Sequence, residues 1–272
     1  MKNLLTANAF RMFRHKAFWA ATAFLAMYGG FEAVGLYRQG ESALSYGLFA
    51  GVTFLGVALA AFCSFFLGTE YQDGALRNKV SAGYRRSQIY LSGLLICLLG
   101  GGLIWCAYEG IYLVVGRLLL GGEHMDWGAV AGKLLTVLFL ILSYVALYTC
   151  LGSLLQNKAT LTAVALLLSF AMLFCGLYLY NRLDEPPVYP AEIQQQESEM
   201  EQGARNPYYL QGTAREVYEV LYDLLPNGQG MQILSDTLDT PGEGATLAGI
   251  SLGTAGVWTA LGLAVFQRRD LR

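Results

Sequence analysis

Six long apolar runs are the feature that most constrains how this chain of 272 residues can fold. They cover residues 17–37, 43–68, 89–116, 134–155, 159–180 and 245–266. A helix rises about 1.5 Å per residue and the hydrocarbon core of a bilayer is roughly 30 Å thick, so about 20 apolar residues cross it. Each run meets that length, and the sequence therefore predicts an all-α integral membrane protein with six transmembrane helices.

The composition agrees with a membrane location. Hydrophobic residues make up 55% of the chain and charged residues 14%, which is too apolar for a water-soluble domain of this size. The net charge of -2 is not that of a nucleic-acid partner, which would carry a basic face. The five cysteines lie in apolar runs without metal-ligand or redox spacing, so we expect them to be core residues and expect no metal site.

The distribution of Lys and Arg predicts the orientation. With the N-terminus inside, twelve of these residues fall on the cytoplasmic side and six on the other, which favours cytoplasmic N- and C-termini. The cations before the first run suggest a signal peptide, but the run is long and is not followed by a small-x-small cleavage site. We therefore expect a retained first span.

These patterns divide the chain into segments. The predicted segments are an N-terminal interfacial helix at 1–16, helices one to five within 17–180 with a cytoplasmic loop at 69–88, an extracellular loop of roughly 65 residues at 181–244, the sixth helix at 245–266 and a cytoplasmic tail at 267–272. The interfacial assignment of 1–16 follows from apolar residues gathered on one side of a helix with cations on the other. An ordinary positively charged flank explains the same pattern.

The loop at 181–244 has two parts. Residues 184–203 are rich in Pro, Glu and Gln, a composition typical of poorly ordered segments. Thr213 and Glu216 then form a capping-box pattern, followed by apolar residues at helical spacing as far as Pro226. We expect a short amphipathic helix, either against the outer membrane surface or capping the helix bundle.

The loop at 69–88 has the pattern of a docking element. Leu76 and Val80 lie four residues apart, Arg77 and Lys79 flank them, and Gly83 stands where a helix would end. A short helix with an apolar knob and basic edges can dock in a groove of a cytoplasmic partner. A plain cytoplasmic loop that follows the positive-inside rule is the alternative.

The same loop resembles the signature region of permeases of type-2 ABC (ATP-binding cassette) exporters. The matching residues are Glu70, Tyr71, Gly74, Leu76, Arg77, Asn78, Lys79, Gly83 and Arg85, with Ala75 in place of the usual Thr. Residues 206–208, 225–229 and 266–272 also resemble the family, so the likeness extends over most of the chain.

The resemblance implies a six-helix permease in a bacterial cytoplasmic membrane. It implies pairing with a second permease copy or a paralogue and with two cytoplasmic ATPase subunits, whose closure would push on a coupling helix. It assigns ATPase coupling to Glu70, Tyr71, Gly74, Leu76, Arg77, Asn78, Lys79, Val80, Gly83 and Arg85. ATP and Mg would bind in the partner subunit, and this chain would hold no cofactor.

Catalysis by the chain itself is not expected. The string at 128–134 has three residues between its glycines instead of four and Leu in place of Ser or Thr, so it is not a phosphate-binding loop. His15 and His124 fall on opposite predicted sides of the membrane, and no G-x-S-x-G elbow is present, which leaves a membrane-embedded enzyme as the weakest alternative. An ion- or proton-coupled carrier that uses Glu32 and Glu109 is the other alternative.

Two groups within the spans are candidate substrate or gating residues. Glu32 and Glu109 are acids inside apolar runs, where a carboxylate is costly; pairing with Arg38 or Arg117 or reaching the interface is the structural alternative. Gly100, Gly101 and Gly102 predict either a hinge in the third helix or close helix packing.

Overall fold

A computed structural model describes residues 1–72, 74–121, 127–188, 206–235 and 241–268. Every regular element in these residues is a helix, and six segments are long and apolar enough to cross a membrane. The spans contain α2 (Lys16–Gln39), η1 (Leu44–Gly47) with α3 (Val52–Gln72), α5 (Arg86–Leu119), α6 (Trp127–Leu154), α7 (Lys158–Asp184) and α11 (Pro241–Arg268). The predicted all-α fold with six candidate membrane spans is confirmed.

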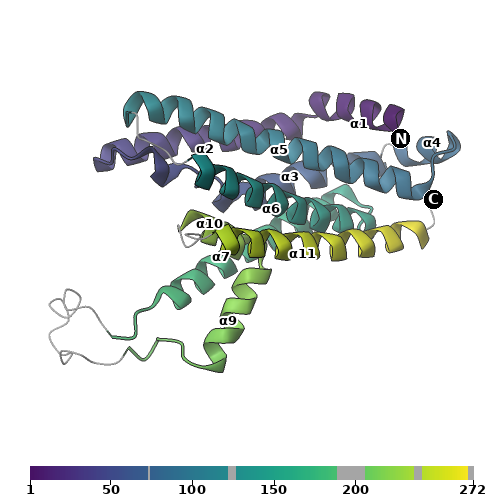
Figure 1. The fold of residues 1–272 in the computed structure, drawn as a ribbon. Helices are drawn as coiled ribbons and strands as arrows, with labels where there is room; N and C mark the ends of the chain where they lie inside the picture. Colours follow the sequence, from purple (N-terminus) through teal and green to yellow (C-terminus); the bar gives the residue numbers. More distant parts are fainter. Residues whose placement is uncertain (73, 122–126, 189–205, 236–240, 269–272) are drawn as a thin grey trace.

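Four shorter helices complete the described fold. They are α1 (Lys2–Arg14), α4 (Ala75–Ser81), α9 (Thr213–Leu224) and α10 (Pro226–Leu234). Figure 1 shows the spans running side by side, with the start of α1, the α4 helix and the end of α11 at one end of the bundle. We call this the α4 end. Helix α10 packs against α3, α6 and α7, while α9 stands away from the bundle.

Tyrosines fill much of the bundle core. Tyr108 and Tyr112 of α5 and Tyr144 and Tyr148 of α6 are fully buried, and the rings stack in pairs along each helix. A buried tyrosine needs a partner for its hydroxyl group. The Tyr148 hydroxyl donates to the Gly56 carbonyl of α3 at 3.1 Å, so the ring packing and the hydrogen bond fix α6 against α3.

The second span is broken, which corrects the prediction of one helix over 43–68. The 3-10 helix η1 ends at Gly47, and Phe49 has a φ of 86° in the left-handed region before α3 begins. The Tyr112 hydroxyl donates to the Leu44 carbonyl and accepts from the Gly47 N–H, and Tyr108 donates to the Gly47 carbonyl. These hydroxyl groups satisfy the backbone groups that the break frees from the helix.

Helices α1 and α2 meet at His15, whose extended backbone separates them. Leu4, Asn8 and Met12 of α1 are buried, and α1 contacts α5. Phe10 remains 59% exposed, so α1 presents one face to the bundle and another outward. The N-terminal segment is thus a separate helix, and its predicted interfacial position stays a prediction.

The region after residue 205 departs from the predicted pattern at both ends of α9. Thr213 is the first residue of the helix, Gly212 is its N-cap, and no side chain caps it, so the capping box is wrong. Pro226 does end α9, but it also starts α10, because proline suits the first turn of a helix. The poorly ordered segment expected at 184–203 falls mostly outside the described residues.

Candidate functional site

The turn between α3 and α4 depends on glycine. Gly74 is the N-cap of α4 with a φ of 65°, a conformation that L side chains rarely adopt. At the other end Gly83 has a φ of 86°, its N–H donates to the Val80 carbonyl, and the Tyr84 N–H donates to the Lys79 carbonyl. This is a Schellman motif, and the predicted end of the helix at Gly83 is confirmed.

Glu70 is the centre of an ion cluster at the α4 end. Its side chain is almost fully buried and forms ion pairs with Arg11 of α1 and Lys79 of α4. The Lys79 ammonium also donates to the Asn8 side chain at 2.9 Å, and Asn8 donates to Ser92 of α5 at 3.1 Å. The cluster therefore joins α1, α3, α4 and α5.

Lys79 is more than half buried in this cluster. Its burial lowers the pKa of the ammonium group below the ordinary value, while the charge of Glu70 and the hydrogen bond to it act in the opposite direction and Arg11 adds to the lowering. Arg11 also lies over the Phe66 ring, with its guanidinium carbon 4.4 Å from the ring centre. One carboxylate thus pairs with two cations, one of which also packs on an aromatic ring.

The structure corrects the prediction that Leu76 and Val80 form one exposed docking surface. Leu76 is only 5% exposed and points into the bundle, whereas Val80 is 37% exposed. Arg77 and Asn78 are exposed beside Val80. The outward face of α4 includes these three residues, and Leu76 packs against the bundle on the inner side of the helix.

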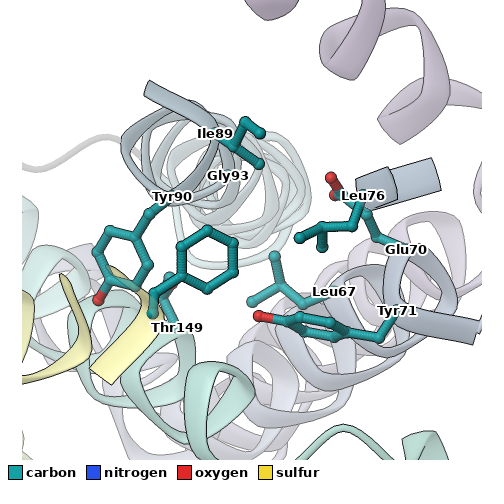
Figure 2. Close-up of a pocket in the computed structure, with 9 residues that line it drawn as sticks. Leu67, Glu70, Tyr71, Leu76, Ile89, Tyr90, Gly93 and Thr149 are labelled. Atoms are coloured by element: carbon teal, nitrogen blue, oxygen red, sulfur yellow. The ribbon is translucent and has the colours of Figure 1, made fainter. Parts of the chain in front are cut away.

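Leu76 reaches a small cavity of about 20 Å³ between the helices. Figure 2 shows Leu76 and Leu67 pointing towards each other, with Ile89, Tyr90 and Tyr71 around them. The remaining lining residues are Glu70, Gly93, Thr149 and Phe266. Five helices, α3, α4, α5, α6 and α11, contribute to the wall, so a movement of α4 bears directly on the bundle.

The other residues assigned to coupling lie around this core. Tyr71 lines the cavity, and Arg85 is the N-cap of α5, where its backbone N–H donates to the Gln88 side chain at 3.2 Å. Asn8, Arg11 and Ser92 were missed from the sequence. Arg11 was counted only as part of the N-terminal charge, and no local signal indicates that it meets Glu70, 59 residues away.

A second polar cluster lies in α10, around two residues buried to 2% exposure or less. Asn227 accepts a hydrogen bond from the Tyr144 hydroxyl at 2.6 Å and donates to the Thr53 carbonyl at 3.4 Å. Gln229 accepts from the Ser251 hydroxyl of α11 and donates to the Asp223 carbonyl at 2.6 Å. These bonds join α10 to α3, α6 and α11.

The two acids within the spans differ in environment. Glu32 is half-buried and hydrogen-bonds Tyr28 one turn earlier. Glu109 is 9% exposed, and within the described residues neither of its carboxylate oxygens has a hydrogen-bond partner. The structural alternative in which Glu109 pairs with Arg117 is therefore not seen in the described residues. The indole N–H of Trp105, one turn away on α5, is also buried without a partner in this part of the chain.

The glycines of α5 serve close packing. A Cβ atom at Gly100 would lie 2.6 Å from the Phe62 ring, and one at Gly101 would lie 2.9 Å from Ile141. Gly102 has no neighbour within 4 Å, and α5 is continuous through all three positions. Of the two predicted roles, packing applies to Gly100 and Gly101.

Acidification is expected to destabilise the α1–α2 junction through His15. Its ring accepts from the Ala17 N–H at 3.3 Å, and burial together with Lys158 and Arg11 lowers its pKa below 6.5. Because the unfolded chain takes up the proton first, stability is lost as the pH falls below 6.5. The thermal midpoint should be lower at pH 5.5 than at pH 7.5. His15→Asn keeps a capping side chain and should remove this part of the pH dependence; an unchanged dependence would contradict the assignment.

Within the described residues no group of three or more His, Cys, Asp or Glu side chains is placed to hold a metal ion. No family model matches this sequence, and a comparison with curated proteins finds no similar sequence.

Proposed function

We propose that this chain is the permease subunit of an ATP-driven ABC exporter in a bacterial cytoplasmic membrane. Two permeases, identical or paralogous, would form the substrate pathway, and two cytoplasmic ATPase subunits would supply ATP and Mg. The α4 end would then be cytoplasmic, in agreement with the Lys and Arg count, and α9 and α10 would lie towards the outer side. The chain itself would carry out no catalysis and bind no cofactor.

The observation that carries the proposal is the attachment of α4. A helix that transmits force must present residues to its partner and be firmly fixed to the part that moves. Arg77, Asn78 and Val80 face outward, while the Lys79–Glu70 ion pair and Leu76 fix α4 to the bundle. The residues that resemble the exporter signature thus lie on two faces of α4: one faces outward and the other packs against the bundle.

The attachment of α10 to three spans agrees with such a role. In a transport cycle that alternates between two states, one side of the pathway is shut while the other is open. The hydrogen bonds of Asn227 and Gln229 hold α10 across the spans at a distance from α4. A force on α4 would reach α10 only through α3, α6 or α11. Each of these three helices lines the cavity that Leu76 enters.

The test is assembly with a candidate ABC ATPase subunit. We expect the parent chain and the ATPase to co-purify in detergent and Val80→Asp to lose the complex, because the change places a charge on the outward face of α4. Arg77→Glu should weaken the complex as well. Both side chains are exposed, so these variants should keep the thermal midpoint of the parent chain.

Leu76→Asp is the matched control. It buries a carboxylate beneath α4 and should lower stability whether or not a partner exists. Loss of the complex with Leu76→Asp alone, while Val80→Asp and Arg77→Glu bind normally, would contradict docking through the outward face.

The buried Glu109 favours one second candidate, an ion- or proton-coupled carrier. A carboxylate without a partner inside a membrane span is costly, and such residues often bind the transported ion. Proteoliposomes that contain only this chain distinguish the two functions. Uptake or release of a substrate driven by an ion gradient without ATP, and lost in Glu109→Gln, would replace the exporter with the carrier.

A further inference from the structure

An apolar groove of about 490 Å³ lies where α9 meets α11. Its wall consists of Leu224 from α9 and Ile250, Gly253, Thr254, Val257 and Trp258 from α11. Helices α9 and α11 contact each other, and Figure 1 shows α9 running away from α11. None of the residues that line the groove belongs to the Glu70 cluster or to α10.

The lack of a side chain at Gly253 deepens the groove, because no atom lies within 4 Å of where a Cβ would stand there. Gly249 and Gly256 of the same helix are equally open but do not line the groove. The volume is within the range of about 300–1,000 Å³ found for small-molecule sites. A long, thin ligand fits this space better than a second helix, which is about 10 Å wide and would have to avoid α9.

The chemistry of the wall selects an apolar occupant. The Thr254 hydroxyl is already bonded to the Ser251 carbonyl and the Ser143 hydroxyl, both at 3.0 Å. Among the other lining side chains only the Trp258 indole offers a donor. A ligand in the groove thus gains contact with hydrocarbon and aromatic surface and is offered few hydrogen bonds.

The position of the groove along the candidate span indicates that its occupant comes from the lipid bilayer. Residues 250–258 lie in the middle of a segment that can span a membrane, and Leu252, Val257 and Leu261 of the same segment are 50% exposed or more. The groove is continuous with this lipid-facing surface. On the other side, Leu224 joins it to the exposed apolar face of α9, which consists of Val217, Val220, Leu221 and Leu224.

We propose that the α9–α11 groove is a lipid-binding site that holds one acyl chain of a phospholipid from the leaflet on the α9 side. The apolar face of α9 rests on the same leaflet, as expected for a helix with one apolar and one charged face. Arg215 and Glu219 form an ion pair on the polar side of α9 at 2.9 Å. The site does not depend on the exporter proposal, because it involves no ATPase partner.

The experiment uses the full chain in nanodiscs of phosphatidylcholine with brominated acyl chains, which quench nearby tryptophans. Trp258 lines the groove, so the difference in quenching between the parent chain and Trp258→Phe reports the chain in the site. We expect strong quenching of Trp258 and a phospholipid that stays bound when the protein is moved into detergent, as measured by the mass of the intact complex.

Filling the groove is the decisive variant. Gly253→Leu places a side chain in the groove, where nothing obstructs it, and should abolish the retained phospholipid and most of the Trp258 quenching. Gly249→Leu is the matched control, since it faces open space on the same helix but does not line the groove. If Gly253→Leu does not fold, Val257→Phe fills the groove from an exposed position.

Two results would overturn the proposal. Equal quenching and equal lipid retention in the parent chain and in Gly253→Leu would show that Trp258 meets only passing bilayer lipid. A parent chain whose Trp258 is shielded from brominated chains would show that another protein surface covers the groove. Failure of ATPase binding would affect neither measurement, so the two proposals fail separately.

Discussion

Replacing Glu70 with Gln is expected to lower the free energy of unfolding by about 3 kcal/mol, since breaking a buried ion pair leaves its partner charge uncompensated. Glu70 is 4% exposed and is the shared partner of Arg11 and Lys79. The glutamine keeps the size of the side chain but not its charge. Titration with SDS from mixed micelles, followed by loss of helical circular dichroism, measures the change.

Two controls test whether the effect comes from the buried Glu70 cluster or from the loss of any ion pair. Glu219→Gln removes the exposed ion pair with Arg215 and should change the stability by less than about 1 kcal/mol. Glu70→Gln combined with Lys79→Met should cost less than the sum of the two single changes, because both remove the same interaction. Additive losses, or equal effects of Glu70→Gln and Glu219→Gln, would show that Glu70 does not organise the α4 end.

Replacing Gly228 with Ala is expected to dislodge α10 and to cost about 1–3 kcal/mol, the usual range for overpacking a buried site. The added Cβ would lie 2.1 Å from the Tyr222 carbonyl oxygen and 2.8 Å from its ring. The nearest obstacle is backbone, so it cannot be relieved by a change of rotamer. The hydrogen bonds of the neighbouring Asn227 and Gln229 should loosen, which amide hydrogen exchange in α10 would detect as faster exchange.

Gly102→Ala is the matched control for this variant. Gly102 lies in α5 with no atom within 4 Å of the added Cβ, so the alanine should stabilise the helix by up to about 1 kcal/mol. A loss of stability from Gly102→Ala would revive the predicted hinge. If amide exchange in α10 were as slow in Gly228→Ala as in the parent chain, the close packing at Gly228 would not be what holds α10 in place.

The spans could be predicted because the criterion is local. An apolar run of sufficient length must cross the bilayer as a helix whatever it packs against, and all six runs fall in candidate spans. The break after Gly47 could not be predicted, because residues 43–68 are apolar throughout. It depends on Tyr108 and Tyr112, whose hydroxyl groups reach it from 61 to 68 residues away.

The candidate site was predicted in outline. The spacing of Leu76, Val80 and Gly83 indicated a short helix and its end, and both are present. Spacing shows which residues share a face but not whether the helix lies flat on its neighbours, so the burial of Leu76 was not foreseen. Glu70 was identified through resemblance alone. Its partner Arg11, and Asn8, which accepts a hydrogen bond from its other partner Lys79, come from a helix at the far end of the sequence.

The length of α5 determines where the Glu70 cluster lies relative to lipid. Its 34 residues extend about 51 Å, some 20 Å more than the hydrocarbon core. A centred, upright α5 therefore projects about 10 Å beyond the hydrocarbon at each end. Ser92 is about 9 Å from the start of α5, so the polar chain from Ser92 through Asn8 to Lys79 meets the headgroup layer. Arg11 and Lys79 together leave one positive charge that Glu70 does not neutralise. This charge would attract anionic lipids, and the lipid composition of the host membrane would then influence how firmly α4 is held.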